Sequence, residues 1–374
     1  MRGNGTKAIG AGCLAALGLI AAGLGGASSA RAAGFVGFTN GKLAFSSKAD
    51  GDAEIYTVNA DGSGRTQLTF NGAADTTPVW SPDGKRIAFA SNREGNWDVY
   101  VMQSDGSSAV NLTGESSAAE TAPTWSPDGH SIAFTSDRTG SKQIFVQDLL
   151  QLLDGSGPTQ LTYLGTSEDP SWGISGGVER IFFTSNRDGD DEIYSMLPNG
   201  FGLIQLTNNG RRDRHPRWSR SGHVYYETNL GGDFEVFRMK PDGSQVEAIT
   251  QNGKQDLQPT GSPDGESVAF IRGKGSRGDL FVGDVGGAGT VRLTNDKVAD
   301  ELPDWQAIRL PSLSLPTIFD VQVVPHGLEM EVLFRTSKTV TRPVVEVFRG
   351  SLLESFQLGS GSGTSWAITV GALD

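Results

Sequence analysis

The chain has 374 residues, more than one compact core of about 150 residues needs and enough for a large repeat fold with an extra module. Its 37% hydrophobic content and short regular apolar runs exclude a disordered chain, and its 51 glycines follow no three-residue period, which excludes collagen. The net charge of −12 argues against nucleic acid and anionic membrane surfaces as partners. Dense glycine and turn residues without long helical patterns predict an all-β protein.

Residues 1–33 are interpreted as a secretory signal peptide. Arg2 and Lys7 precede an Ala- and Gly-rich apolar stretch from Ala8 to Gly26, and small residues suited to cleavage follow. The alternative, an uncleaved membrane anchor, ranks second because the stretch is only weakly apolar. Cleavage would remove Cys13, the chain's only cysteine. We therefore expect a mature protein without thiols or a membrane span, located in the periplasm or outside the cell.

A repeat of about 45 residues organises residues 34–308. The string Trp-Ser-Pro-Asp-Gly at residues 80–84 recurs at 125–129, and looser copies follow with the same step. Six copies of this length are typical of a β-propeller with six four-stranded blades. The repeated Trp residues are interpreted as packing between blades, with an exposed aromatic cage as the alternative. The six marker positions are Trp80, Trp125, Trp172, Trp218, Gly261 and Trp305.

One copy can be followed strand by strand. Its first strand ends at Trp80, and residues 81–84 make a type I turn. Further strands are predicted at 87–91 and 98–102, and a fourth ends at Thr113. The first copy begins at its second strand, whereas the last copy ends with an unpaired first strand at 303–305. This last strand is expected to complete the first blade and close the ring.

These residues resemble the TolB-type β-propeller family. The stretch from Pro78 to Phe89, Pro-Val-Trp-Ser-Pro-Asp-Gly-Lys-Arg-Ile-Ala-Phe, carries the resemblance, which covers about residues 40–308. Related repeats form the propellers of TolB, of tricorn-type proteases and of prolyl-oligopeptidase relatives. The resemblance implies the six-bladed fold, while a function has to be argued from a site.

Six carboxylates stand at or beside the third position before the proline of each first strand. Because first strands are the innermost ones, these residues are predicted to ring one mouth of the central channel and to bind calcium or a basic peptide. The alternative is that each caps a neighbouring backbone turn. The residues are Asp75, Glu120, Glu168, Asp213, Asp256 and Asp300.

A second acidic position, represented by Glu54 and Asp98, precedes the third strand in five of the six copies, and Gln143 takes its place in the third copy. It is expected to pair with arginines such as Arg93 across the hairpin, a contact worth at most about 1 kcal/mol when exposed.

No catalytic residue and no cofactor other than calcium is predicted. Residues 173–177 match the G-x-S-x-G string of serine hydrolases, but they replace the Ser-Pro-Asp-Gly turn and follow no strand-to-helix elbow. The four histidines show no metal-ligand spacing.

Residues 309–374 are predicted to form a small β-sandwich-like module. Strands are expected near 320–324, 328–335, 343–349 and 366–370, after a Pro-containing linker. The module resembles the first strands of an immunoglobulin- or fibronectin-like domain, which needs about 100 residues. The hypotheses are a truncated chain or missing strands supplied by a partner.

The sequence therefore predicts an exported, non-catalytic scaffold that binds a protein partner, or a ligand, through the acidic channel mouth and the blade loops. The competing hypothesis is a propeller hydrolase or lyase, or a substrate-gating relic of a prolyl-oligopeptidase-like peptidase.

Overall fold

The computed structural model describes residues 38–370, except 152–154, 274–276, 287–288, 297, 310–317, 327–328, 342–343, 350–351 and 358–361, with side chains described up to Arg309. The predicted signal peptide and the predicted linker lie outside the described residues. Phe38–Arg309 form one compact unit. No helix in the described part of the chain is long and apolar enough to span a bilayer.

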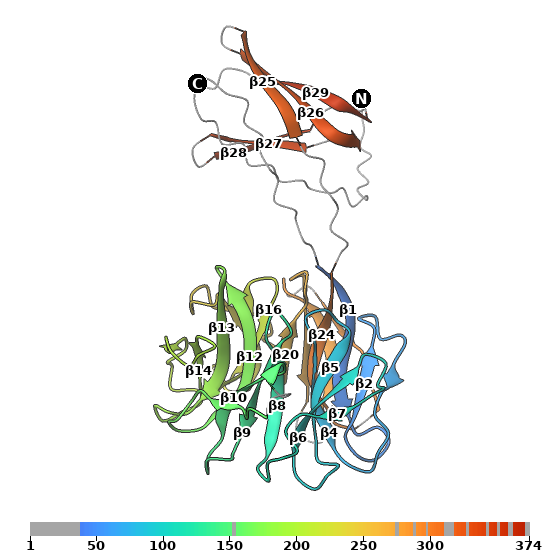
Figure 1. The fold of residues 1–374 in the computed structure, drawn as a ribbon, viewed down its shortest axis with the longest axis vertical. Coiled ribbons are helices and arrows are strands. Elements are labelled where there is room, and N and C mark those ends of the chain that lie inside the picture. The colour runs from blue at the N-terminus through green and yellow to red at the C-terminus, as the bar shows by residue number, and fades with distance from the viewer. Residues whose placement is uncertain are drawn as a thin grey trace. The chain divides into compact units, whose positions relative to one another are not determined.

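This unit is a six-bladed propeller of four-stranded antiparallel sheets, which confirms the predicted fold (Figure 1). Blade 1 comprises β24 (Asp300–Arg309), β1 (Phe38–Ser47), β2 (Glu54–Val58) and β3 (Thr66–Gln67); blade 2 comprises β4 (Asp75–Trp80), β5 (Arg86–Ser91), β6 (Asp98–Gln103) and β7 (Val110–Asn111); blade 3 comprises β8 (Glu120–Trp125), β9 (Ser131–Ser136), β10 (Gln143–Asp148) and β11 (Thr159–Gln160). Blade 4 comprises β12 (Ser167–Ser175), β13 (Val178–Ser185), β14 (Glu192–Met196) and β15 (Ile204–Gln205); blade 5 comprises β16 (Asp213–Ser219), β17 (His223–Thr228), β18 (Glu235–Met239) and β19 (Glu247–Ala248); blade 6 comprises β20 (Asp256–Gly261), β21 (Ser267–Arg272), β22 (Asp279–Asp284) and β23 (Thr290–Arg292).

Blade 1 closes the ring as the strand count requires. The last strand of the propeller, β24, pairs antiparallel with the first, β1, from Phe38 opposite Arg309 to Ser47 opposite Asp300. Both strands have ten residues, whereas most inner strands of the other blades have six or seven. The pairing protects two strand edges that an open array would expose.

The Ser-Pro-Asp-Gly turn links the innermost strand of a blade to the second strand. In blade 2 the Ser81 hydroxyl donates to Asp83 Oδ1 over 2.6 Å, and the Gly84 amide donates to the Ser81 carbonyl over 2.8 Å. Gly84 has φ +69°, a left-handed conformation that glycine adopts at little cost. The string therefore recurs in blades 2, 3 and 6, whose innermost strands need the same tight reversal, whereas blade 4 uses a two-residue hairpin and blade 1 has no connection from β24 to β1.

The core lies between neighbouring blades. Trp80 of blade 2 packs in one cluster with Ala44, Ile55 and Leu68 of blade 1, and only 6% of its surface is exposed. The other marker tryptophans are also buried, except Trp218, which is half-buried. Within each blade, an aromatic pair from the second and third strands is in contact with ring centroids 5.7 to 6.2 Å apart, stacked in four blades and tilted in blades 1 and 5. The repeated tryptophans are thus packing residues and do not form an exposed cage.

The fifth marker position, Gly261, has a compensating partner. A Cβ atom built on Gly261 would lie 2.1 Å from the Tyr225 ring, which is fully buried. Where the marker is Trp80, the second strand of the preceding blade has Ala44 at the position equivalent to Tyr225. A large and a small residue have therefore exchanged places across one interface, so that its volume is filled.

Beyond the propeller, the described residues form five strands in two antiparallel sheets. One sheet has the order β25 (Ile318–His326), β26 (Glu329–Thr341) and β29 (Ser362–Val370), and the other pairs β27 (Val344–Arg349) with β28 (Leu352–Gln357). Four of these strands overlap the predicted ones, and β28 was not predicted.

Candidate functional site

The predicted carboxylates do not face the channel mouth. Five of the six, all except Glu168, begin the innermost strand of a blade, and each is at most 1% exposed. In blade 4 the equivalent residue is Ser167, and the neighbouring Glu168 pairs at the surface with Lys142 over 2.6 Å. A partner cannot reach the five buried carboxylates. The prediction that these residues form a contact surface at the channel mouth is therefore wrong.

Each buried carboxylate interacts with neighbouring side chains of the propeller. Arg93 pairs with Asp75 over 2.7 Å, Arg138 pairs with Glu120 over 3.0 Å, and Arg272 contacts both oxygens of Asp256 over 2.7 and 2.8 Å. The arginines thus pair with first-strand carboxylates, and not with the acids before the third strands as expected. Their guanidinium groups also lie over the aromatic pair of the blade. These carboxylates fix blade geometry.

The acids that precede the third strands lie beside these carboxylates. Burial, with a smaller contribution from Asp75, raises the pKa of Glu54 to about 7. Burial likewise raises the pKa of Glu192 to about 7, with Asp213 nearby. At the interfaces that contain Glu54 and Glu192, two carboxyl groups therefore lie close together and are shielded from water.

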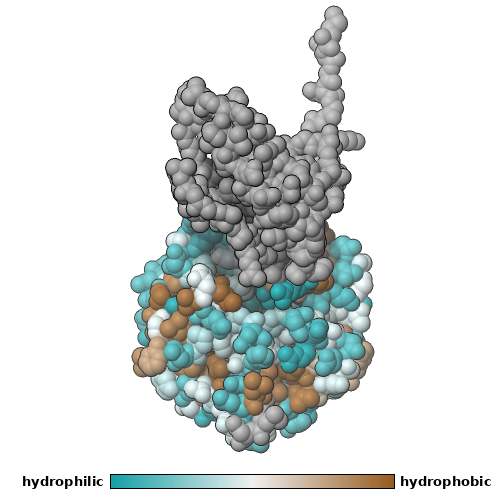
Figure 2. Space-filling view, turned by 45° about the horizontal axis from the view of Figure 1, so that its top comes forward, coloured by the Kyte–Doolittle hydropathy of each residue, from teal (hydrophilic) through white to brown (hydrophobic). Residues whose placement is uncertain are grey.

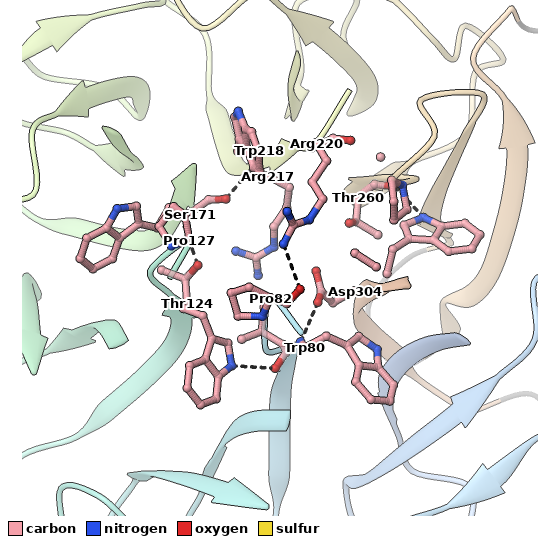
Figure 3. Close-up of a pocket in the computed structure, with 18 of the residues that line it drawn as sticks. Trp80, Pro82, Thr124, Pro127, Ser171, Arg217, Trp218, Arg220, Thr260 and Asp304 are labelled. Atoms are coloured by element: carbon pink, nitrogen blue, oxygen red, sulfur yellow. Dashed lines mark hydrogen bonds between the residues drawn. The ribbon is translucent and has the colours of Figure 1, made fainter. Parts of the chain in front are cut away.

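A cavity of about 150 Å³ lies on the axis, at the end of the propeller where the Ser-Pro-Asp-Gly turns lie, and residues of all six innermost strands line it (Figure 3). The residue before each marker position lines it. In three interfaces the side chain at this position accepts a hydrogen bond from the backbone amide of the next blade's tryptophan, at 2.8 to 3.2 Å. The six residues in blade order are Asp304, Val79, Thr124, Ser171, Arg217 and Thr260.

The charged residues that line this cavity are Asp304, Arg217 and Arg220. Asp304 Oδ2 accepts the Trp80 amide over 2.8 Å. Burial raises the pKa of Asp304 to about 7, although the Trp80 amide and Arg217 both lower it. The side chain is only half-buried by surface area because it faces the cavity.

Arg220 reaches across the axis. It starts in blade 5, and its Nη2 donates to the Pro82 carbonyl of the opposite blade 2 over 3.1 Å (Figure 3). Its guanidinium also lies 4.1 Å from the ring centroid of Phe38. Burial and the charge of Arg309 lower the pKa of Arg220. The Arg220 side chain therefore lies across this end of the channel. The two groups that it contacts there, the Pro82 carbonyl and the Phe38 ring, are uncharged.

A second ring of residues lies two positions earlier along the same strands. All six have left-handed backbones with φ between 49° and 54°, and the pairing with the second strand shifts register there. Such β-bulges re-aim side chains and are rare for residues other than glycine. The six are Leu302, Thr77, Ala122, Asp169, His215 and Gln258.

His215 of this ring lies between two carboxylates. Its Nε2 is 3.3 Å from Asp169 Oδ2, and its Nδ1 is 3.2 Å from Glu227 Oε1, although Nδ1 is not aligned for a hydrogen bond. Burial disfavours the imidazolium, but Asp169 and Glu227 outweigh it and raise the pKa of His215 to about 9. His215 is therefore a cation at neutral pH.

Sequence reasoning missed His215, Arg217, Arg220 and Asp304. A signal was present: at the position before the marker, other blades have small or apolar residues, and only two blades have charged ones. Ser175, of the G-x-S-x-G string, ends β12 in the two-residue hairpin to β13, which is not a nucleophile elbow.

Figure 2 shows hydrophobic residues on the visible face as separate patches among hydrophilic ones. Exposed large hydrophobic side chains include Phe70, Tyr163 and Phe201, each in a loop between strands. Because these patches are separate, the axial cavity remains the better defined site.

The fold and the repeated turns define a TolB-type propeller. The family model named TolB beta propeller domain matches residues 37–119 and 165–307, more than half of the chain, and the chain belongs to this family. No curated protein matches the chain in sequence.

Solved structures agree on the fold. TolB from Acinetobacter baumannii is 21% identical with a TM-score of 0.62, and the match covers 71% of this chain and 66% of that chain. A putative TolB from Agrobacterium tumefaciens is 20% identical with a TM-score of 0.56, covering 72% of this chain and 99% of that one. A chain of a nidogen/laminin complex is 10% identical with a TM-score of 0.55, covering 71% and 98%. This chain thus spans just under two thirds of the Acinetobacter TolB.

Proposed function

We propose that this protein is an exported, non-catalytic scaffold of the cell envelope or extracellular space, which binds a partner protein at the channel mouth formed by the Ser-Pro-Asp-Gly turns. The observation that carries the proposal is the axial cavity with two guanidinium groups and one carboxylate. Export rests on the predicted signal peptide at residues 1–33.

The charge of the cavity favours an anionic group. Arg217 and Arg220 exceed Asp304 by one positive charge, and protonation of Asp304 near neutral pH increases the excess. A guanidinium binds a carboxylate through two parallel hydrogen bonds, more strongly than it binds a neutral carbonyl. Arg220 can therefore exchange its bond to the Pro82 carbonyl for a carboxylate of a partner. This differs from the basic partner predicted from the sequence.

The size of the cavity limits what enters it. A volume of about 150 Å³ holds one side chain or chain terminus, and not a threaded polypeptide. The turns that follow the innermost strands of blades 2 to 6 would supply the remaining contact area. A propeller of this fold occurs in the nidogen/laminin complex, a complex of two proteins.

Two observations favour binding over catalysis. His215, the histidine nearest the axial cavity along β16, is already protonated at neutral pH and cannot serve as a general base there. Ser175 lies in a hairpin without the geometry of an activated nucleophile. The hydrolase or lyase hypothesis would instead have to use the Asp169, His215 and Glu227 cluster.

The test uses the chain from residue 34. Partners captured from envelope and secreted extracts are identified, purified and titrated against three forms by calorimetry: the wild type, Arg220→Gln and, as a matched control, Arg238→Gln. Arg238 pairs with Glu247 on the outer strands, away from the axis. We expect Arg220→Gln to weaken binding about tenfold or more and Arg238→Gln to change it less than about twofold.

Equal binding by Arg220→Gln and the wild type would show that the partner does not use this mouth. Turnover of peptide or polyuronide substrates by the wild type, lost in His215→Asn, would replace the scaffold by the enzyme hypothesis.

A further inference from the structure

The loop that leads from the outer strand of one blade to the innermost strand of the next repeats one arrangement. A threonine lies two residues after the outer strand, and its hydroxyl accepts the amide of the second residue of the third strand in all six blades, at 2.8 to 2.9 Å. In four loops a carboxylate follows six residues after the threonine: Asp75, Asp213, Asp256 and Asp300.

In three of these four loops, an asparagine two residues after the threonine bridges two carboxylates. Its backbone amide donates to the acid before the third strand, at 2.6 to 2.9 Å. Its side-chain amide donates to the carboxylate of the innermost strand, at 2.7 to 2.8 Å. The amide hydrogens thus compensate two neighbouring acids that burial would otherwise penalise. The bridging residues are Asn71, Asn209 and Asn252.

The fourth loop, between blades 6 and 1, has Asp296 in place of the asparagine. Asp279 begins the third strand, Asp300 begins the innermost strand, and the three residues each offer an oxygen within 4.8 Å of the others. A donor has been replaced by a third acceptor at the position where the other loops require a donor.

One oxygen of each carboxylate is occupied. Asp279 Oδ2 accepts Arg292 over 2.6 Å, Asp296 Oδ2 accepts Arg65 over 2.6 Å, and Asp300 Oδ2 accepts the Thr294 hydroxyl. The other oxygen of each, Oδ1, is buried and has no hydrogen-bond partner among the described residues, although Ser47 lies near Asp300. Asp300 as a whole is 1% exposed.

The charges of this cluster do not balance. Three carboxylates face two guanidinium groups, those of Arg65 and Arg292, and Asp300 forms no ion pair within the described part of the chain. The cluster therefore holds one more carboxylate than it has guanidinium partners, and that carboxylate is buried.

We propose that Asp279, Asp296 and Asp300 bind a calcium ion between blades 6 and 1. Calcium prefers carboxylate oxygens at about 2.4 Å, so two of its ligands lie at most about 4.8 Å apart, and the three oxygens of this cluster all lie within 4.8 Å of one another. Water completes the coordination, because Asp296 is partly exposed. A second carboxylate group, Asp50, Asp52 and Glu54, is less suited: Asp50 is exposed and already accepts Gln67.

The position of this site gives the ion a structural role. Asp300 is the first residue of β24, the strand that closes the ring, while Asp279 belongs to blade 6. The ion therefore ties the closing strand β24 to the last blade, beside the β24–β1 pair that joins the two ends of the propeller.

The experiment measures calcium binding by the chain from residue 34 after treatment with a chelator. Calorimetry should show one site per chain, and saturating calcium should raise the Tm by about 5 °C. Asp296→Asn recreates the arrangement of the other loops and is therefore expected to fold. It should lose at least about tenfold in calcium affinity and have a higher Tm than the calcium-free wild type.

Asp50→Asn is the matched control, and its calcium response should equal that of the wild type. The proposal is overturned if the wild type shows neither binding heat nor a Tm shift at millimolar calcium, if Asp296→Asn retains the response, or if Asp50→Asn loses it.

Discussion

His215 combines two features at the scale of the residue. It has a left-handed backbone with φ 51°, which histidine tolerates better than most residues, and its ring is held between Asp169 and Glu227. The charge on the imidazolium lowers the pKa of Glu227, although burial alone would raise it. The three groups therefore stabilise one another only while His215 is protonated.

This charge predicts a pH dependence of stability. The pKa of His215 is about 9 in the folded protein and about 6.5 when unfolded, so its contribution is complete below about pH 6.5 and is lost as the pH rises through 9. Between pH 7.5 and 10 the wild type should lose on the order of 2 kcal/mol, measured as a falling Tm. The window starts at 7.5 because Glu54, Glu192 and Asp304, with pKa values of about 7, are mostly ionised above that pH.

His215→Asn is the comparison, because asparagine tolerates the left-handed backbone and carries no charge. Its Tm should be lower than that of the wild type at pH 7.5 and nearly constant up to pH 10. A parallel decline in both proteins would assign the pH dependence to other groups.

At the scale of the element, the exchange of Tyr225 and Gly261 shows how one interface kept its volume. Trp218 shows a related adjustment. Phe182 of the preceding blade replaces the small residue that other tryptophans pack against, Trp218 is only half-buried, and a Cβ atom on Gly173 would lie 2.2 Å from its indole. Residues that face each other across a blade interface therefore change together. A blade can be present even where its marker tryptophan is replaced, as at Gly261.

The exchange predicts strong coupling between two substitutions. Tyr225→Ala leaves a cavity and should lower the free energy of unfolding by about 3–5 kcal/mol. Gly261→Trp alone should also lower it by several kcal/mol, because Tyr225 already occupies the space. The double variant restores the arrangement of Ala44 and Trp80. Its unfolding free energy in guanidinium should exceed the additive expectation by at least about 2 kcal/mol. Strict additivity would show that the two positions do not share a packing space.

The same scale explains what could be predicted from the sequence. Each blade solves the same packing problem, so its turn, its tryptophan and its threonine recur, and the fold and the strand positions follow from the period. The positions of the carboxylates at the start of the innermost strands also follow. Their direction does not, because the left-handed residue two positions after each, such as Thr77 after Asp75, shifts the alternation of sides.

The axial site could not be predicted in the same way. Asp304 and Arg217 are single departures from the repeat, and they meet because strands about 90 residues apart end at one axis. The repeat in the sequence reveals the residues that the six blades have in common. The axial site depends instead on residues that occur in single blades.

At the scale of the whole molecule, stability depends on one strand pair that closes a ring of some 270 residues. Thr39 and Ile308 are register partners near the end of this pair, and both are exposed. The double variant Thr39→Cys and Ile308→Cys should form a disulfide in the chain from residue 34, which has no other cysteine. We expect it to raise the unfolding free energy by about 3 kcal/mol, because it closes a long loop.

The control for this prediction is Ser175→Cys with Val178→Cys, register partners across a two-residue hairpin. It closes a very short loop and should stabilise the protein far less. Both effects should vanish with a reductant. An equal gain from both pairs would show that ring opening does not limit the stability of the propeller.

The register of β1 and β24 also determines how the propeller responds to force. Phe38 and Arg309 lie opposite each other, so the chain enters and leaves the propeller side by side at the same end of an antiparallel pair. Tension applied through the two chain ends therefore loads the hydrogen bonds of this pair one at a time, as in a zipper, instead of shearing them together. The propeller should resist unfolding by heat and denaturant and yet open at a low pulling force. Opening should begin at the channel mouth, where Arg220 crosses the axis.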